Sequence, residues 1–167
     1  PRQVRDAGRE ILPLLGEGSV LLLSPPGGGK TTLLREIVRT WSDGGTRVAL
    51  ADERGEIAAA LDGAPQFDVG RCTDVLSGAP KAEAALLLLR SKNPQVIALD
   101  EISAPEDAAA VLQLAGCGIR VLATAHAEDV SALRRRAVYR TLLKEHIFQQ
   151  AVVISRAAAR VYRVEPL

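Results

Sequence analysis

Residues 24–31 read SPPGGGKT and lie between two runs of different character. The apolar run Val20 to Leu23 precedes them, and the run TLLREIVRTW, which has helical spacing, follows them. Strand, glycine-rich loop and helix in this order are typical of a phosphate-binding P-loop. The glycines Gly27 to Gly29 let backbone N–H groups converge on phosphate oxygens, and the helix N-terminus adds the positive end of its dipole. The stretch therefore predicts an α/β fold that binds a nucleotide.

The side chains of this loop predict how a nucleotide and its metal are held. Lys30 can reach the β- and γ-phosphates of ATP, and the hydroxyl of Thr31 can bind Mg²⁺. The usual pattern begins with glycine where this chain has Ser24, but the Gly-Lys-Thr core is complete. A glycine-rich turn that merely precedes a lysine is the alternative, which the flanking strand and helix disfavour. The residues expected to bind the nucleotide are Pro26, Gly27, Gly28, Gly29, Lys30, Thr31 and Thr32.

A second apolar run, VIALDE, ends in two carboxylates. It predicts a buried strand of the Walker B type, and open α/β sheets place their ligands at the carboxyl ends of such strands. We expect Asp100 to bind Mg²⁺ opposite Thr31, and Glu101 to orient or deprotonate the attacking water. A solvated acidic strand end is the alternative, and the preceding P-loop makes it less favoured.

Further polar groups follow other predicted strands. Thr124 and His126 leave the strand VLATAH, and if that strand lies beside the P-loop strand, they face the γ-phosphate and can sense it. DERGEIA, Asp52 to Ala58, places three acids around Arg54 and suits a polar network near the nucleotide. Arg71 could act in trans on the nucleotide of a neighbouring subunit. For each of these, an ordinary structural or surface role is the alternative.

Composition narrows the class of protein. The chain has 167 residues, a net charge of +1 and 3% aromatic residues, so nothing draws it strongly to nucleic acid or to acidic membranes. Cys72 and Cys117 lack metal-ligand spacing and are expected to be reduced cytosolic thiols. No apolar run reaches the length of about 18 residues that spans a membrane. The cluster Arg134–Arg136 predicts a solvated helix face, or otherwise a contact with a subunit or polyanion.

The hydrophobic pattern predicts strands that alternate with helices, and hence a mostly parallel sheet covered on both faces within one domain, residues 1–167. The segment 52–79 has little periodicity, and so long an irregular segment is usually functional. Strands are expected at 20–24, 48–51, 96–99, 120–124, 151–155 and 160–164, the last two as a hairpin around Ala157-Ala158. Helices are expected at 1–15, 31–42, 81–92, 105–115 and 130–144, the last one possibly broken.

Together, five segments between Ser19 and Ser155 resemble the stage III sporulation protein AA family. They are SPPGGGKTTLLRE, DERGEIA, PQFDVGRCTDVLSGAPKAEA, LLRSKNPQVIALDEI and VLATAH. The resemblance implies a RecA-like ATPase core similar to the motor ATPases of type II and type IV secretion. By position, it assigns Lys30 and Thr31 to the P-loop, Asp100 and Glu101 to Walker B, and His126 to the histidine box. Asp52 to Arg54 resemble the aspartate-box segment. With Arg71, which the resemblance does not assign, the candidate catalytic residues are Glu101, Lys30, His126 and Arg71.

The resemblance also implies partners and place. Such a protein would use ATP and Mg²⁺, form rings or hexamers, and dock from the cytoplasm onto membrane-embedded components of a secretion-like sporulation complex. Its full-length form would carry an N-terminal domain, which a chain that starts at Pro1 and has no methionine is expected to lack. Where the family often has Cys and Ser, this chain has Gly28 and Gly55, but neither change removes a catalytic group.

Two other functions stay open from the sequence. A RecA-type, DNA-dependent ATPase would need a basic strand-binding loop, for which Arg134–Arg136 is the only candidate, so nucleic acid is not the favoured partner. A nucleotide-dependent assembly scaffold with little turnover is the other, and the intact Glu101 argues against it. A small-molecule kinase is less favoured because no lid segment with paired arginines is evident.

Overall fold

The structure, a computed structural model, describes residues 6–156 and 160–167. They form a seven-stranded sheet in the order β3-β2-β4-β5-β1-β6-β7. All neighbouring strands are parallel except β6 and β7, which form an antiparallel hairpin. The strands are β1 Val20–Ser24, β2 Val48–Asp52, β3 Thr73–Ser77, β4 Val96–Glu101, β5 Arg120–His126, β6 Gln150–Arg156 and β7 Arg160–Pro166. The helices are α1 Lys30–Asp43, α2 Lys81–Lys92, α3 Pro105–Gly116, α4 Val130–Arg134 and α5 Ala137–Lys144, with a 3₁₀ turn, η1, at Leu12–Leu14.

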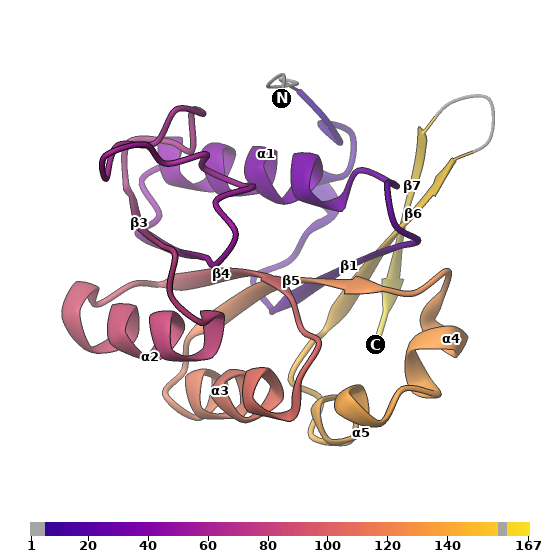
Figure 1. Cartoon of the computed structure of the whole chain (residues 1–167). Helices are drawn as coiled ribbons and strands as arrows, with labels where there is room; N and C mark the ends of the chain where they lie inside the picture. The colour runs from indigo at the N-terminus through magenta and orange to yellow at the C-terminus, as the bar shows by residue number, and fades with distance from the viewer. Residues whose placement is uncertain (1–5, 157–159) are drawn as a thin grey trace.

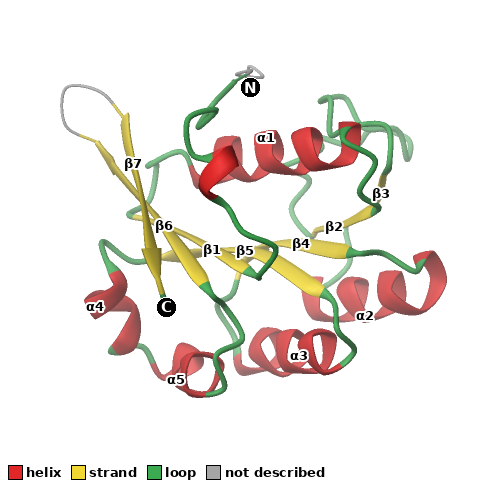
Figure 2. Cartoon of the chain, turned by 180° about the vertical axis from the view of Figure 1, so that it is seen from behind, coloured by secondary structure: helices red, strands yellow, loops and turns green. Residues whose placement is uncertain are grey.

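The helices cover the two faces of the sheet unequally. Helix α1 lies on one face, whereas α2, α3, α4 and α5 lie on the other (Figures 1 and 2). Each face has its own core, one packed against α1 and the other against α2, α3 and α5. The predicted mostly parallel sheet with helices on both faces and a C-terminal hairpin is thus confirmed.

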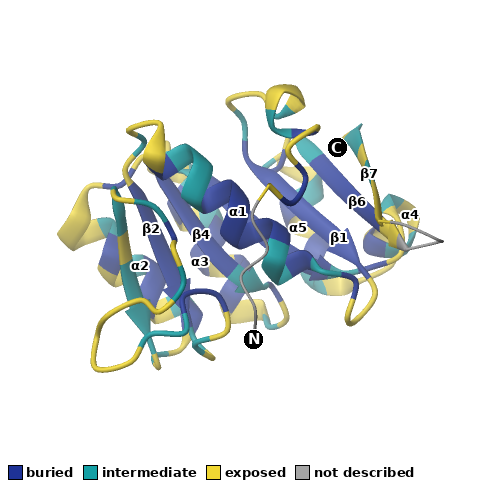
Figure 3. Cartoon of the chain, turned by 90° about the horizontal axis from the view of Figure 1, so that it is seen from above, coloured by how far each residue is buried: buried dark blue, intermediate teal, exposed yellow. Residues whose placement is uncertain are grey.

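Strand β1 lies between these cores, which explains its apolar sequence. Leu21 and Leu23 belong to the core on the α2–α3 side, and Val20 and Leu22 belong to the core on the α1 side. All four side chains are fully buried, as Figure 3 shows for the central strands. Because successive side chains of a strand point to opposite faces, a strand covered on both faces needs apolar residues at every position.

The parallel pairing brings the polar strand ends to one edge of the sheet. Ser24 at the end of β1 pairs with His126 at the end of β5. Glu101 at the end of β4 pairs with Thr124. The register between β4 and β5 shifts between Leu99 and Glu101, so a bulge falls at the predicted acidic pair.

The N-terminal segment differs from its prediction. We expected a helix over residues 1–15, but the described part of it, from Asp6 onward, forms turns and the short η1. Asp6 and Gly8 have φ values of 59° and 69°, in the left-handed region that an α-helix cannot use. Gly8 also packs so closely on Leu33 that it has no room for a side chain. The segment therefore packs against α1 through turns and does not form the expected helix.

The segment 52–79 also differs, because it contains β3 at the edge of the sheet. Its residues Thr73–Ser77 are only half-buried, so the apolar signal of a buried strand is missing. The helix expected over 130–144 is broken, as the sequence allowed, into α4 and α5. The hairpin is confirmed, but its expected turn at Ala157-Ala158 lies outside the described residues. No helix in the described ranges is both long and apolar enough to cross a bilayer.

Candidate active site

A cavity of about 390 Å³ lies at the edge of the sheet where β1, β4 and β5 end. Five segments far apart in the sequence line it: the glycine-rich loop with the start of α1, the segment after β2, the end of β4, the end of β5, and the start of β7. The lining residues are Pro26, Gly27, Gly29, Lys30, Thr31, Thr32, Arg54, Glu56, Asp100, Glu101, Thr124, His126 and Arg160. The cavity thus contains every predicted nucleotide- and metal-binding residue except Gly28.

The loop is shaped by glycines with positive φ. Gly27 has φ +72° and Gly29 has φ +99°, and Gly29 is the N-cap residue directly before helix α1. The first N–H groups of an α-helix have no partner within the helix. Those of α1 therefore face the cavity with the positive end of the helix dipole, an arrangement suited to an anion.

Lys30 is buried, and its ammonium is bonded at the centre of the site. The Nζ atom donates to Ser24 O at 2.9 Å, Ser24 Oγ at 3.2 Å and Pro25 O at 3.2 Å, and it lies 2.8 Å from His126 Nδ1. Burial lowers the pKa of Lys30, and the carboxylates of Glu101 and Asp100 oppose that shift. The ammonium therefore has neutral acceptors in contact and negative charge nearby.

His126 connects this lysine to the predicted catalytic base. Its Nε2 lies 3.0 Å from Glu101 Oε2, and its Nδ1 faces Lys30 Nζ. Since an ammonium can only donate, Nδ1 is the acceptor and Nε2–H donates to the carboxylate. The three side chains form a continuous chain of hydrogen bonds from the cation to the base.

The bulge in β4 explains how two consecutive carboxylates reach one cavity. In a regular strand the side chains of Asp100 and Glu101 would point to opposite faces, whereas a bulge re-aims one of them. The hydroxyl of Thr124 lies 3.4 Å from Asp100 Oδ1. On the other side of the bulge, the Tyr139 hydroxyl donates to the carbonyl of Ile102 at 2.5 Å, and burial raises the pKa of Tyr139. The protonated phenol therefore helps to anchor the chain beside Glu101.

The segment after β2 is divided between structure and site. The carboxylate of Asp52 is fully buried and accepts from the N–H groups of Ile57, at 3.2 Å, and Ala58, at 2.8 Å. It therefore holds the turn and does not line the cavity. Arg54 and Glu56, at the top of this turn, do line the cavity. From the sequence these residues form one group, and their separate roles depend on the turn that the structure shows.

A cluster of ion pairs, in which Lys81 and Asp107 are buried and Glu53 is partly exposed, connects the same segment to α2 and α3. Lys81 at the start of α2 lies 3.2 Å from Glu53 and 3.6 Å from Asp107. The carboxylate of Asp107 also accepts from the N–H groups of Ser103 and Ala104, and so caps α3 directly after the bulge. Lys81 and Asp107 were missed by sequence reasoning, because their partners lie on other elements.

Arg71 lies at the opposite edge of the sheet. It precedes β3, and its guanidinium donates to the carbonyl of Asp43 at 3.0 Å. Asp43 ends α1, a helix of 14 residues, which is about 21 Å long. Arg71 is therefore not brought to the cavity of its own chain, so the expected role would need a second subunit.

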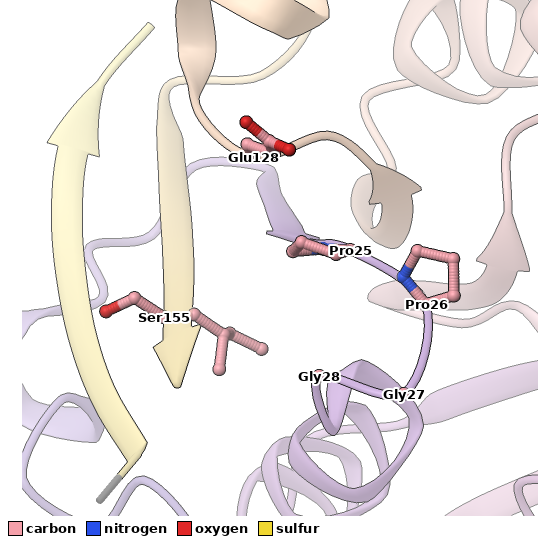
Figure 4. A pocket seen from close by; sticks show the side chains of 7 residues that line it. Pro25, Pro26, Gly27, Gly28, Glu128 and Ser155 are labelled. Carbon is pink, nitrogen blue, oxygen red and sulfur yellow. The ribbon is translucent and has the colours of Figure 1, made fainter. Parts of the chain in front are cut away.

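Sequence reasoning missed two other features of the site. Arg160, at the start of β7, lines the cavity although it lies far from the loop in the sequence. Gly28 does not line it, and instead faces a second cavity of about 330 Å³ (Figure 4). That cavity is formed by Pro25, Pro26, Gly27, Gly28, Glu128, Ile154 and Ser155. Its lining, all within the described residues, has one carboxylate and no lysine or arginine, so it offers a phosphate less positive charge than the main cavity does.

The exposed arginines Arg134–Arg136 stand apart from the main cavity. Arg135 and Arg136 line a separate cavity of about 330 Å³ next to His126 and Glu128. Their cluster thus lies beside the site but not in the space that contains Lys30 and Asp100.

The sequence profile of the family "Sporulation stage III, protein AA" matches residues 2–164. The chain belongs to this family. It is also 37% identical over 164 residues to stage III sporulation protein AA of Bacillus subtilis, a match that covers 93% of this chain and 53% of that protein. A further relative, the protein SEEDLING PLASTID DEVELOPMENT 1 of Arabidopsis thaliana, is 34% identical over 114 residues, covering 66% of this chain and 16% of the plant protein. The chain thus spans about half the length of the Bacillus relative and a smaller share of the other curated relatives that it matches.

Solved structures confirm the fold expected of this family member. The Legionella pneumophila ATPase DotB has a TM-score of 0.70 and 20% identity, over 97% of this chain and 48% of DotB. The VirB11 ATPase of the Brucella suis type IV secretion system has a TM-score of 0.65 and 18% identity, over 95% of this chain and 50% of VirB11. The pilus retraction motor PilT, with bound ADP, has a TM-score of 0.64 and 18% identity, over 94% of this chain and 49% of PilT. The chain therefore has the P-loop fold of secretion ATPases, as predicted.

The contact between Gly28 and Ser24 generates a test of the loop. A Cβ added at Gly28 would lie 2.6 Å from Ser24 Cβ and also too close to Ser24 Oγ. We expect Gly28→Ala to lower the free energy of unfolding by about 1–3 kcal/mol, because the added methyl group would overpack this region. In a Ser24→Gly background the same change should cost clearly less, which a double-mutant cycle of denaturant unfolding measures.

Gly116→Ala is the matched control, because nothing lies within 4 Å of the added Cβ and φ is not positive. Its free energy of unfolding should stay near that of the wild type. An undiminished cost of Gly28→Ala in the Ser24→Gly background would contradict the packing described here.

Proposed function

We propose that the chain is the ATP-binding and ATP-hydrolysing motor core of a secretion-like sporulation complex. The observation that carries the proposal is the single cavity in which Lys30, Thr31, Asp100 and Glu101 meet at the N-terminus of α1. These groups supply a phosphate cation, a hydroxyl–carboxylate pair and a base, the parts that phosphoryl transfer to water requires. Membership of the sporulation family and the likeness to ATPases of secretion systems support the same function.

Magnesium fits the donors on offer. The hydroxyl of Thr31 and the carboxylate of Asp100 are hard oxygen ligands in one cavity. Among the described residues, no three or more His, Cys, Asp or Glu side chains are grouped to hold a metal without further ligands. That suits Mg²⁺, which is usually held by one or two protein oxygens together with substrate phosphates and water. When bound, the ion neutralises phosphate charge.

The chain's own residues would divide the reaction as follows. Lys30 leaves its neutral acceptors Ser24 and Pro25 for the phosphate oxygens, which attract its charge more strongly. Glu101 accepts a proton from the attacking water as the water oxygen bonds to the γ-phosphorus. The bond from that phosphorus to the β–γ bridging oxygen breaks, so ADP and phosphate are the products. His126 is hydrogen-bonded to both Lys30 and Glu101, so a shift of Lys30 toward the γ-phosphate would change the hydrogen bonding of Glu101.

Assembly would complete the site. We propose that the subunits form a ring or hexamer, that Arg71 acts at the boundary between two of them, and that the complex docks from the cytoplasm on membrane-embedded components. Support comes from the type IV secretion ATPase named above and from the position of Arg71, exposed and remote from its own cavity. A full-length family member would use an additional N-terminal domain to build the ring, as the resemblance to secretion motors implies, and the Bacillus relative is long enough to carry a further domain.

Lys30→Ala tests nucleotide binding. It removes the ammonium at the centre of the cavity, so the affinity for ATP·Mg²⁺ should fall at least about tenfold, as a lost charge-assisted hydrogen bond implies. Titration calorimetry measures the affinity for ATP. Lys92→Ala is the control, because Lys92 is an exposed lysine at the end of α2 that pairs with Asp74 on β3 and does not line the cavity. Equal ATP affinity in wild type and Lys30→Ala would sink the assignment of the cavity.

Glu101→Gln separates hydrolysis from binding. The amide keeps the shape of the side chain but cannot take a proton, so turnover should fall by about 10² or more while ATP is still bound. Phosphate release and calorimetry on the same preparation measure both, and Glu106→Gln, an exposed residue of α3, is the control. Unchanged turnover in an active wild-type background would remove Glu101 from the reaction. Binding without turnover in the wild type would favour the scaffold function.

Arg71→Ala tests assembly. If Arg71 acts on a neighbour, the specific ATPase activity of the wild type should rise with protein concentration, and the variant should lose this rise while binding ATP normally. Arg90→Ala, an exposed arginine on α2, should keep the rise. A rise of the same size in Arg71→Ala, with association monitored by light scattering, would show that this arginine only caps α1 through Asp43.

A further inference from the structure

The C-terminal hairpin brings a second cation to the glycine-rich loop. The guanidinium of Arg160 lies directly on Gly29, since a Cβ added at Gly29 would meet Arg160 Cζ at 2.8 Å and Nη2 at 3.0 Å. The same side chain lines the cavity with Lys30 and Thr31. Within the part of the chain that the structure describes, this guanidinium has no carboxylate partner, whereas Arg163 on the same strand pairs with Glu165.

The packing of β7 determines where this side chain points. Residues 160, 162 and 164 share one face of the strand, because the side-chain period of a strand is two. Tyr162 and Val164 pack against the core on the α1 side of the sheet. Arg160 therefore emerges on the face of α1 at the level of the loop, and Arg163 emerges on the opposite face.

The order of strands indicates which part of a nucleotide Arg160 can meet. Strand β1 has β5 on one side and β6 on the other, and β7 lies beyond β6. Glu101 and His126, the groups assigned to the γ-phosphate, end β4 and β5. Arg160 flanks the loop from the other side, where the phosphates nearest the nucleoside would lie.

We propose that Arg160 is a nucleotide-binding residue of its own subunit, which binds the α- and β-phosphates of a nucleoside di- or triphosphate. The proposal rests on the function given above and extends it to the hairpin. A guanidinium offers paired N–H donors that match phosphate oxygens, and a charge-assisted hydrogen bond of this kind is stronger than a neutral one. The hairpin is thereby part of the nucleotide site and not only an edge of the sheet.

Arg160→Gln tests this assignment by calorimetric titration with ATP and, separately, with ADP. A lost guanidinium–phosphate contact lowers affinity by about ten- to a hundredfold. We expect the loss to be equal for ATP and ADP, because both nucleotides carry the α- and β-phosphates. Arg163→Gln removes the same charge from the other face of β7 and should bind both nucleotides as the wild type does. The unfolding temperature of Arg160→Gln should not change, since the side chain is exposed.

Each other outcome overturns the proposal. If Arg160→Gln binds both nucleotides with wild-type affinity, Arg160 does not contact the phosphates. If only ATP binding weakens, Arg160 contacts the γ-phosphate instead. If Arg163→Gln weakens binding equally, the effect is one of general charge and not of a specific contact. If Lys30→Ala loses affinity while Arg160→Gln binds both nucleotides as tightly as the wild type, only this inference fails. If the wild-type chain binds neither nucleotide, the proposed function fails with it.

Discussion

The parallel pairing of β1 with β5 is the constraint on which the site depends. Its register places Ser24 opposite His126, so the start of the glycine-rich loop and the end of β5 leave the sheet together. Lys30 on the following helix then meets His126 at 2.8 Å, and β4 beside β5 brings Glu101 within 3.0 Å of the same imidazole. Both hydrophobic cores hold β1 in place, because its apolar side chains are fully buried on each face of the sheet.

A buried cation surrounded by bonded acceptors gives the site its chemical character. Removing Lys30 from water is costly, and burial accordingly lowers its pKa despite the carboxylates of Asp100 and Glu101. Carbonyl oxygens of Ser24 and Pro25 compensate for part of that cost. A polyanion would compensate for it better, because it offers full negative charge in place of neutral dipoles. The same residues thus explain the shape of the loop and support the phosphate binding that we propose for it.

Local rules were enough to predict the central groups and not the peripheral ones. Lys30, Asp100 and His126 each follow a strand in a recognisable pattern, and parallel strands must end at one edge, so their meeting followed from sequence. Arg160 could not be predicted, because its place depends on how the hairpin packs beside β1. Likewise the half-buried β3 lacks an apolar signal, and the left-handed turn at Gly8 replaces a helix that the periodicity favoured. The actual position of Arg71 depended on the same long-range packing.

The central claim is that phosphate binds at the carboxyl edge between α1 and the ends of β4 and β5. A crystal structure of the chain with a non-hydrolysable ATP analogue and Mn²⁺ tests it most directly, since the anomalous signal locates the metal. The account predicts phosphates beside Lys30 and the metal beside Thr31 and Asp100. An analogue in the cavity of Glu128 and Ser155, or a metal remote from Asp100, would contradict it.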